Sequence, residues 1–328
     1  MNLWWTKKVL ASVKSNRDPL YKAGLLGVIA VVVVSSMVGC KSLVLKTVMT
    51  TVEPYFHGKE VDGTQFEKIT DKVFTFRWNW YRNLIIVTDV GLVVIDPMNS
   101  DMATALKKGL VQRFPDKKVH TLIYSHYHLD HTRGGALLAP SEVIAHEKSA
   151  TYWKDFEHGD VLVPTRLIQG DTTLSIGGVE IRALYMGLSH TDTLYAFHLP
   201  SENLIFTADL GLVKSVAPVG VPDRYAPGYL AALNRLAAID FQIFVPSHFG
   251  YGKKQDLLDW RDMMEDSRRL ARDAIKSNGA IGTRDKQLPA YFDAVYYPMR
   301  DKYGSWHGFN EMFILNLVRD IEGETLGH

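Results

Sequence analysis

Residues 124–135 read YSHYHLDHTRGG and concentrate side chains that can bind a metal ion within a single short loop. These side chains are His126, His128, Asp130 and His131. His126 and His128 are two residues apart, so an extended backbone points both the same way. Four ligands from one short loop suit two adjacent metal ions better than one, because a single ion rarely takes neighbouring residues of a tight turn together. The loop therefore predicts a metal site.

Further candidate ligands each end a buried apolar run later in the chain. The segments EIRALYMGLSH, NLIFTAD and FQIFVPSH end at His190, Asp209 and His248. In layered α/β folds, functional sites collect at the ends of strands. We therefore expect these residues to meet the first loop at one edge of a sheet.

The ligand types indicate the chemistry. Imidazole and carboxylate suit zinc, and they also suit iron or manganese. Two ions about 3.5–4 Å apart can share a water molecule and lower its pKa to about 7. The bridging hydroxide can then attack a carbonyl carbon while the second ion stabilises the developing oxyanion. Asp130 is expected both to bind a metal ion and to orient the hydroxide, so no side chain has to act as the nucleophile.

An alternation of strands and helices would position these residues. Strands are expected within 72–97, at 118–126, 172–176, 179–186, 194–199, 203–207 and 241–248, and helices at 100–114, 228–239 and 255–279. Ser100 is the expected N-cap of the first helix. Strands that alternate with helices favour a layered α/β architecture.

The motif H-x-H-x-D-H, here HYHLDH, together with the three downstream ligands resembles the metallo-β-lactamase-fold hydrolases. The resemblance covers about residues 66–250 and is nearest to the glyoxalase II and lactonase-like branches. It implies a four-layer αββα sandwich with two metal ions, expected to be zinc, at one edge of the two sheets. Asp96, in GLVVIDP, matches an aspartate that supports the site from behind the ligands.

The resemblance also implies how the ligands are divided. The first ion would be held by His126, His128 and His190, the second by Asp130, His131 and His248, and Asp209 would bridge both. Several true β-lactamases carry cysteine or serine where Asp209 stands, which argues against antibiotic hydrolysis. The implied substrate is therefore a small ester, lactone, thioester or amide.

The N-terminus has the pattern of an export signal. A basic region precedes the apolar run 23–38, and MVGC at 37–40 resembles the lipobox of bacterial lipoproteins. We therefore expect a signal peptide over 1–39, lipidation of Cys40 and a polar tether over 40–65. An uncleaved membrane anchor is the alternative. Both place the rest of the chain outside the cytoplasm and attached to a membrane.

The remaining chain is expected to form one catalytic unit. The metallo-β-lactamase-like domain is predicted over 66–288, followed by a helical extension of the same domain over 289–328. The 328 residues include 46% hydrophobic residues, enough for a sizeable core. The net charge of +1 gives no support to nucleic-acid binding, and the one cysteine excludes an internal disulfide. Nothing in the pattern indicates an oligomeric state.

Aromatic side chains near the expected site could contact a substrate. Trp78 and Trp80 lie in an early turn and could grip an apolar molecule, although a place in the core is equally compatible with the pattern. Tyr225, Tyr229 and Tyr251 lie in loops after the later ligands and could donate a hydrogen bond to a substrate oxygen.

Other functions remain alternatives at this point. A di-iron oxidoreductase of the same fold usually carries glutamate where His128 stands, so the histidine favours hydrolysis. A nuclease of the same fold usually carries a large inserted domain and a basic groove, and this chain shows neither. A lipoprotein that binds metal without catalysis is the last alternative.

Overall fold

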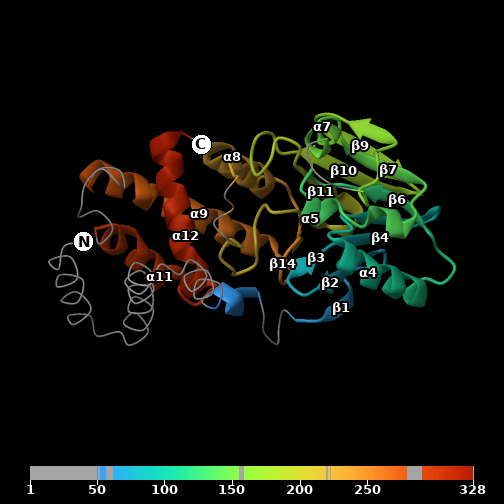
Figure 1. Cartoon of the computed structure of the whole chain (residues 1–328), viewed down its shortest axis with the longest axis horizontal. Coiled ribbons are helices and arrows are strands. Elements are labelled where there is room, and N and C mark those ends of the chain that lie inside the picture. The colour runs from blue at the N-terminus through green and yellow to red at the C-terminus, as the bar shows by residue number, and fades with distance from the viewer. Residues whose placement is uncertain are drawn as a thin grey trace, which may run out of the picture. The chain divides into compact units, whose positions relative to one another are not determined.

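The computed structural model describes residues 50, 52–56, 62–154, 159–218, 221, 223–278 and 290–327 (Figure 1). The chain divides into two units, Met1–Pro54 and Tyr55–His328, and the account below concerns the second. The expected signal peptide and Cys40 lie outside the described residues. Within the described residues, no helix combines the length and the apolar character needed to cross a bilayer.

The first sheet is antiparallel at one side and parallel at the other. Its strands are β1 (Thr64–Lys68), β2 (Val73–Trp78), β3 (Tyr81–Arg82), β4 (Leu84–Thr88), β5 (Gly91–Ile95), β6 (Val119–Ile123), β7 (Glu142–His146) and β8 (Arg166–Ile168). The order is β1-β2-β4-β5-β6-β7-β8, with β3 paired to β2. The strands β5 to β8 run parallel. All five residues of β5, GLVVI, are buried, as a strand covered on both faces requires.

The second sheet has the order β14-β13-β12-β11-β10-β9. Its strands are β9 (Thr172–Ile176), β10 (Val179–Tyr185), β11 (Tyr195–Leu199), β12 (Leu204–Thr207), β13 (Ile243–Pro246) and β14 (Gly252–Lys253). In β10, Val179, Ile181 and Ala183 are buried while the residues between them are exposed, so this strand covers the core with one face only. The central strand β11 is buried throughout.

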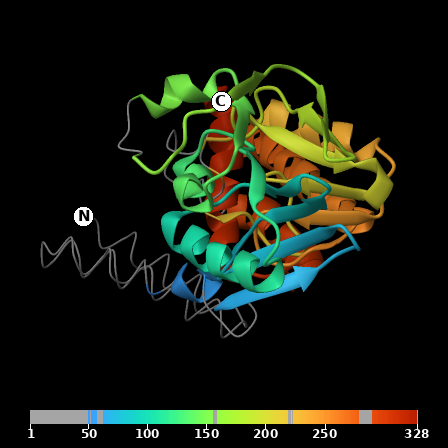
Figure 2. The same ribbon diagram turned by 90° about the vertical axis from the view of Figure 1, so that its right-hand side faces the viewer.

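Helices cover the outer faces of the two sheets (Figure 2). The helices of the described residues include α4 (Ser100–Arg113), α5 (Leu129–Thr132), α6 (Gly135–Leu138), α7 (Ser149–Trp153), η1 (Pro200–Glu202), α8 (Ala226–Ala237), α9 (Lys254–Asn278), η3 (Phe292–Tyr296), α11 (Tyr297–Tyr303) and α12 (Phe309–Leu326). Leu106 and Leu110 of α4 join Phe74 of the first sheet in one core cluster. On the second sheet, the side chains of Phe244 in β13 and Leu257 in α9 both pack beside Gly211. The expected αββα architecture is confirmed.

The C-terminal helical extension is also present. Helix α12 packs along α9, and η3 and α11 contact the same helix. The N-cap of α4 differs from the expectation: Asn99 accepts a hydrogen bond from the backbone N–H of Met102, so the cap is Asn99 rather than Ser100. An amide side chain satisfies the first free N–H groups of a helix as well as a hydroxyl does.

One residue of the expected tether is buried in the second unit. Tyr55, within the expected tether, is fully buried and its hydroxyl donates to the carbonyl oxygen of Val216 at 2.6 Å. Its ring stacks on His307 and fills the space above Gly308. Tyr55 thus packs with the second unit, and the domain boundary expected at Phe66 stays a prediction.

Candidate metal centre

The strand ends bring the late candidate ligands together. Strands β12 and β13 are parallel neighbours with Thr207 opposite Pro246, and each strand is followed two residues later by a candidate ligand, Asp209 or His248. Asp209 has a left-handed backbone with φ of 52°. Aspartate and asparagine tolerate this conformation better than most residues, which explains how the chain turns a carboxylate inward directly after a strand.

Asp209 lies at the centre of the cluster. Its Oδ2 is 3.1 Å from Nε2 of His190, 3.2 Å from Nε2 of His131 and 3.6 Å from Nε2 of His126. Its Oδ1 is 2.6 Å from Nε2 of His248. One carboxylate therefore contacts imidazoles that the family resemblance divides between two different ions.

Three overlapping groups of described residues have the spacing of metal ligands, and two of them share Asp209. The first of these two contains His126, His128, His190 and Asp209, and the second contains His131, Asp209 and His248. The third group is Asp96, His126 and His131, on the buried side. In the first group, Nδ1 of His128 lies 3.1 Å from Nε2 of His190. Ring nitrogens at this separation are compatible with one shared zinc ion, since zinc–nitrogen distances are about 2.0–2.1 Å.

Asp130 lies at the margin of the cluster. Its Oδ2 is 3.8 Å from Nε2 of His131, and its side chain is 48% exposed. The hydroxyl of Tyr81 donates a hydrogen bond to the same oxygen at 3.2 Å. Asp130 is thus not part of either compact group, but it faces the second one and is open to solvent.

Asp96 contacts the cluster from its buried side. Its Oδ1 accepts the backbone N–H of Ser125 at 2.8 Å, and its Oδ2 accepts the Ser125 hydroxyl at 2.6 Å. Oδ2 also lies 3.3 Å from Nδ1 of His131. The Ser125 hydroxyl is in turn 2.9 Å from Nδ1 of His126. Asp96 therefore orients two imidazoles, one directly and one through Ser125.

Burial and neighbouring charges shift the pKa values of the clustered residues. Burial and the neighbouring histidines hold the pKa of His126 well below its ordinary value. Burial also lowers the pKa of His131, but the charges of Asp209 and Asp130 outweigh it and raise that pKa well above its ordinary value. Burial raises the pKa of Asp209, yet His131 and His248 bring it well below the usual range. The carboxylate stays ionised among imidazoles and attracts a cation.

Unsatisfied nitrogen atoms show that the residues fit a metal ion. Nε2 of His126 and Nε2 of His131 are buried and have no hydrogen-bond partner among the described residues, although both point toward Asp209. Buried polar atoms are rarely left without a partner, because each costs about 1–3 kcal/mol. A divalent cation would satisfy both nitrogens, and a donor set of imidazole and carboxylate matches such a cation.

Residues 81–248, just over half of the chain, match the family profile of the metallo-beta-lactamase superfamily. The chain belongs to this superfamily. The alpha subunit of 2,4-dinitroanisole O-demethylase from Nocardioides sp. (strain JS1661) is 32% identical over 56% of this chain and 57% of its own length. A type 2 metallo-beta-lactamase from Bacillus cereus is 24% identical over 56% of this chain and 72% of its own. The match thus spans little more than half of the demethylase subunit.

A solved metallo-beta-lactamase from Pontibacter korlensis superposes with a TM-score of 0.55 at 20% identity, over 62% of this chain and 99% of its own. At this identity the likeness shows the fold alone. The matched segment includes all of the clustered histidines. Membership and a cluster able to hold divalent metal are therefore both shown.

The expected substrate contacts lie in different surroundings. Trp80 stacks on His248 at 4.5 Å between ring centroids, whereas Trp78 packs against the core cluster of the first sheet. Tyr225 is partly buried and its backbone N–H donates to Ser189. Tyr251 is exposed and lies beside the guanidinium of Arg82. Of these four, only Trp80 has a ring contact with a candidate ligand.

Sequence reasoning missed Ser125, Tyr81 and Asp223. Ser125 directly precedes His126, so its proximity was visible in the sequence, but its contact with Asp96 was not. Tyr81 reaches the site because β3 pairs with β2 beside it. Asp223 lies 2.9 Å from His128, and no local signal in its loop indicated this contact.

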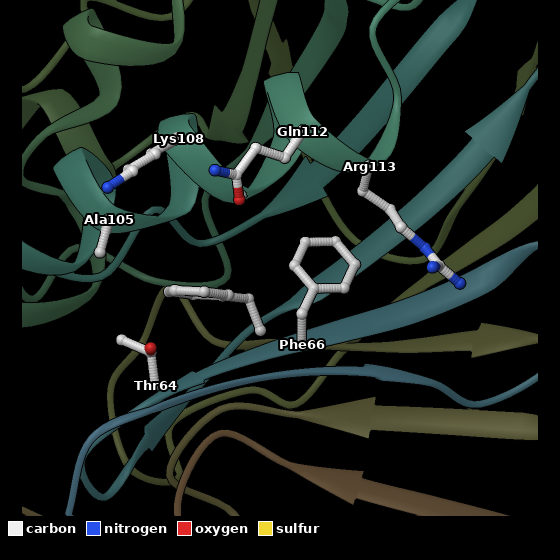
Figure 3. Close-up of a pocket in the computed structure, with 8 residues that line it drawn as sticks. Thr64, Phe66, Ala105, Lys108, Gln112 and Arg113 are labelled. Atoms are coloured by element: carbon white, nitrogen blue, oxygen red, sulfur yellow. The ribbon is translucent and has the colours of Figure 1, made fainter.

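A groove of about 540 Å³ lies between β1 and α4, away from the cluster (Figure 3). Lys108 and Gln112 of α4 stand on one side, and Phe66 of β1 on the other. None of the candidate metal ligands lines it. The groove is therefore not part of the metal centre.

Proposed function

We propose that this protein is a dinuclear metal-dependent hydrolase acting on the carbonyl group of a small ester, lactone, thioester or amide. The position of Asp209 is the observation that supports this proposal most directly. Its Oδ1 contacts His248, and its Oδ2 contacts His190 and His131. A carboxylate with imidazoles on both sides fits two neighbouring cations better than one.

Zinc is the proposed metal, and iron or manganese would also suit the donor set. One ion would be held by His126, His128 and His190, the other by Asp130, His131 and His248, with Asp209 shared. When bound, such a pair supplies Lewis acidity and a water molecule with a pKa near 7.

The chain's own residues would orient and contain the reaction. The Asp130 carboxylate is open to solvent and can accept a proton from the attacking water, while the Tyr81 hydroxyl fixes one of its oxygens. The rings of Trp80 and Tyr127 stand against His248 and His128 and offer apolar surface to a small substrate.

A second candidate is hydrolysis of an electron-poor aryl methyl ether, which would convert the ether and water to a phenol and methanol. The supporting observation is the 32% identity to the alpha subunit of an O-demethylase. The flanking aromatic rings are compatible with an aromatic substrate. A β-lactam hydrolase and a di-iron oxidoreductase are the remaining alternatives.

We also propose that the protein is exported and held at a membrane through lipidated Cys40. The support is the sequence alone: the basic N-terminus, the apolar run 23–38 and MVGC at 37–40. Mass spectrometry of the mature N-terminus from a membrane fraction tests this. An N-terminus that retains residues 1–39 would favour the uncleaved anchor.

The deciding experiment combines metal analysis with Asp209→Asn. Asparagine tolerates the left-handed backbone at this position, so the substitution removes charge with little backbone strain. Asp116→Asn, an exposed aspartate on the loop after α4, is the matched control. A panel of esters, lactones, thioesters, amides, β-lactams and aryl methyl ethers identifies the substrate class.

We expect close to two metal ions per chain in the wild type and loss of hydrolysis in Asp209→Asn but not in the control. Absence of bound transition metal, or unchanged turnover in Asp209→Asn, would contradict the proposal. Consumption of oxygen or nitric oxide by an iron-loaded protein would favour the oxidoreductase.

A further inference from the structure

Two histidines of the first ligand group direct their ring nitrogens to opposite sides. Nδ1 of His128 and Nε2 of His190 face each other at 3.1 Å, and the latter also lies 3.1 Å from Asp209. These nitrogens face the interior of the cluster. The outer nitrogens, Nε2 of His128 and Nδ1 of His190, both face Asp223.

Asp223 spans these two histidines with one carboxylate. Its Oδ2 lies 2.9 Å from Nε2 of His128, and its Oδ1 lies 3.3 Å from Nδ1 of His190. His128 follows β6 of the first sheet, and His190 follows β10 of the second. The carboxylate therefore connects ligands that come from different sheets.

The backbone around Asp223 is fixed from two sides. The backbone N–H of Tyr225 donates to the carbonyl oxygen of Ser189 at 2.7 Å, directly beside His190. On the other side, Arg224 forms a buried ion pair with Asp320 of α12. The side chain of Arg319, also on α12, donates to the carbonyl oxygen of Arg224 at 2.7 Å. Helix α12 thus holds the residue next to Asp223 although it lies outside the segment that matches the family.

We propose that Asp223 is a positioning residue of the metal centre: its carboxylate accepts the outer N–H of His128, attracts the outer nitrogen of His190 at 3.3 Å, and turns the inner nitrogens of both toward the metal. This inference rests on the proposed metal centre. A carboxylate on the outer nitrogen of a ligand histidine fixes the tautomer and ring orientation and makes the imidazole a better donor. Because one carboxylate contacts two ligands of the same ion, its loss should selectively lower the affinity for that ion.

The two supporting carboxylates divide the histidines between them. Asp96 contacts His131 directly and His126 through Ser125. Asp223 contacts the two histidines that Asp96 does not reach. Asp96 is fully buried, whereas the side chain of Asp223 is 38% exposed, so Asp223 can be replaced with less risk to the fold.

The test compares full-length wild type with Asp223→Ala, Asp223→Asn and the exposed control Asp116→Ala. Zinc affinity is measured by competition with a chromophoric chelator, and the ligand field is read from the visible spectrum of the cobalt-substituted protein. We expect Asp223→Ala to bind one of the two ions about 10–100-fold more weakly, with altered cobalt bands. Asp223→Asn, which retains one acceptor oxygen, should lie between, and Asp116→Ala should match wild type.

Thermal unfolding of the metal-free proteins separates positioning from general stability. We expect the same melting temperature for metal-free wild type and Asp223→Ala. Wild-type affinity for both ions and an unchanged cobalt spectrum in Asp223→Ala would overturn the inference while leaving the metal centre intact. The inference would also be overturned if metal-free Asp223→Ala melted at a lower temperature and its affinity for both ions fell equally. A wild type that binds no metal would overturn both proposals.

Discussion

The backbone of Gly228, in the first turn of α8, lies directly against the carbonyl oxygen of Leu188, two residues before His190. A Cβ atom at position 228 would lie 1.8 Å from that oxygen. Gly228→Ala should therefore push the loop that carries His190 away, although alanine is favoured in helices by about 1 kcal/mol. We expect the free energy of unfolding to fall by about 1–3 kcal/mol, measured by urea denaturation, together with reduced metal content.

Gly159→Ala is the control for this substitution. No heavy atom lies within 4 Å of a Cβ built at Gly159, and its backbone has no positive φ. We expect wild-type stability and metal content in this variant. A Gly228→Ala protein as stable and as metal-loaded as wild type would show that the loop before His190 can move without consequence.

Tyr81→Phe should reduce turnover without removing metal. The substitution deletes the hydroxyl that donates to Asp130 at 3.2 Å and leaves the ring against His248. Hydrogen bonds to charged groups contribute about 1.5–3 kcal/mol, and Asp130 is half exposed, so we expect kcat/KM to fall about 3–10-fold. Metal content should stay at the wild-type level. Steady-state kinetics on the substrate found in the panel measures this.

Tyr303→Phe is the matched control, because it also removes a tyrosine hydroxyl that donates to an aspartate. Tyr303 donates to Oδ2 of Asp266 at 2.9 Å among the C-terminal helices, away from the ligand cluster. Its loss should leave kcat/KM unchanged. Equal effects of the two substitutions would mean that the Tyr81 hydroxyl has no special role.

Metal binding should release protons and weaken as the pH falls. The pKa of His131 is raised by Asp209 and Asp130 against the effect of burial, so in the metal-free protein its imidazole keeps its proton to a higher pH than an ordinary histidine does. A metal ion must displace that proton. Calorimetric titration of zinc in buffers of different ionisation enthalpy should show proton release at neutral pH. Identical heats in all buffers would contradict the assignment.

His131 and Asp209 together set a pH range in which they stabilise the metal-free protein. The raised pKa of His131 gives stability that is complete below its unfolded value of about 6.5 and is lost as pH rises through the folded pKa. The lowered pKa of Asp209 gives stability that is complete above about 3.9 and is lost as pH falls through the folded pKa. The metal-free melting temperature should therefore be highest between about pH 4 and 6.5 as far as this pair contributes.

Asp320→Ala should be severely destabilising. Asp320 and Arg224 are 2% and 1% exposed and form an ion pair, and Ser267 also donates to Asp320. Removing the aspartate leaves a buried guanidinium without its charge partner, which costs about 3–5 kcal/mol. Urea denaturation against the exposed control Asp116→Ala measures this. A loss below about 1 kcal/mol would indicate that water replaces the carboxylate.

Much of the metal centre could be predicted from local sequence. The spacing of His126 and His128 and the apolar runs before Asp209 and His248 are local patterns, and the parallel pairing of β12 with β13 converts them into proximity. The contact between Asp223 and His128 depends instead on the path of a loop held by a helix about a hundred residues later in the sequence. No periodicity in the loop encodes that contact.

The burial of Tyr55 was not expected from the sequence. Residues 41–65 are polar enough to suggest a tether, and a single tyrosine among them carries no pattern. Tyr55 is buried because a partner surface, formed by Val216, Phe249 and His307, comes from distant parts of the chain. The two-residue strands β3 and β14 were missed because they are too short to show alternation.

The burial of Tyr55 determines where the protein can be shortened. A version starting at Phe66 would lose the ring that covers Gly308 and leave an apolar hollow beside Phe249, the residue after His248. A cut between Cys40 and Thr50 would retain that ring. A shortened protein for crystallisation should therefore retain Tyr55, even though this residue lies within the segment expected to be a tether.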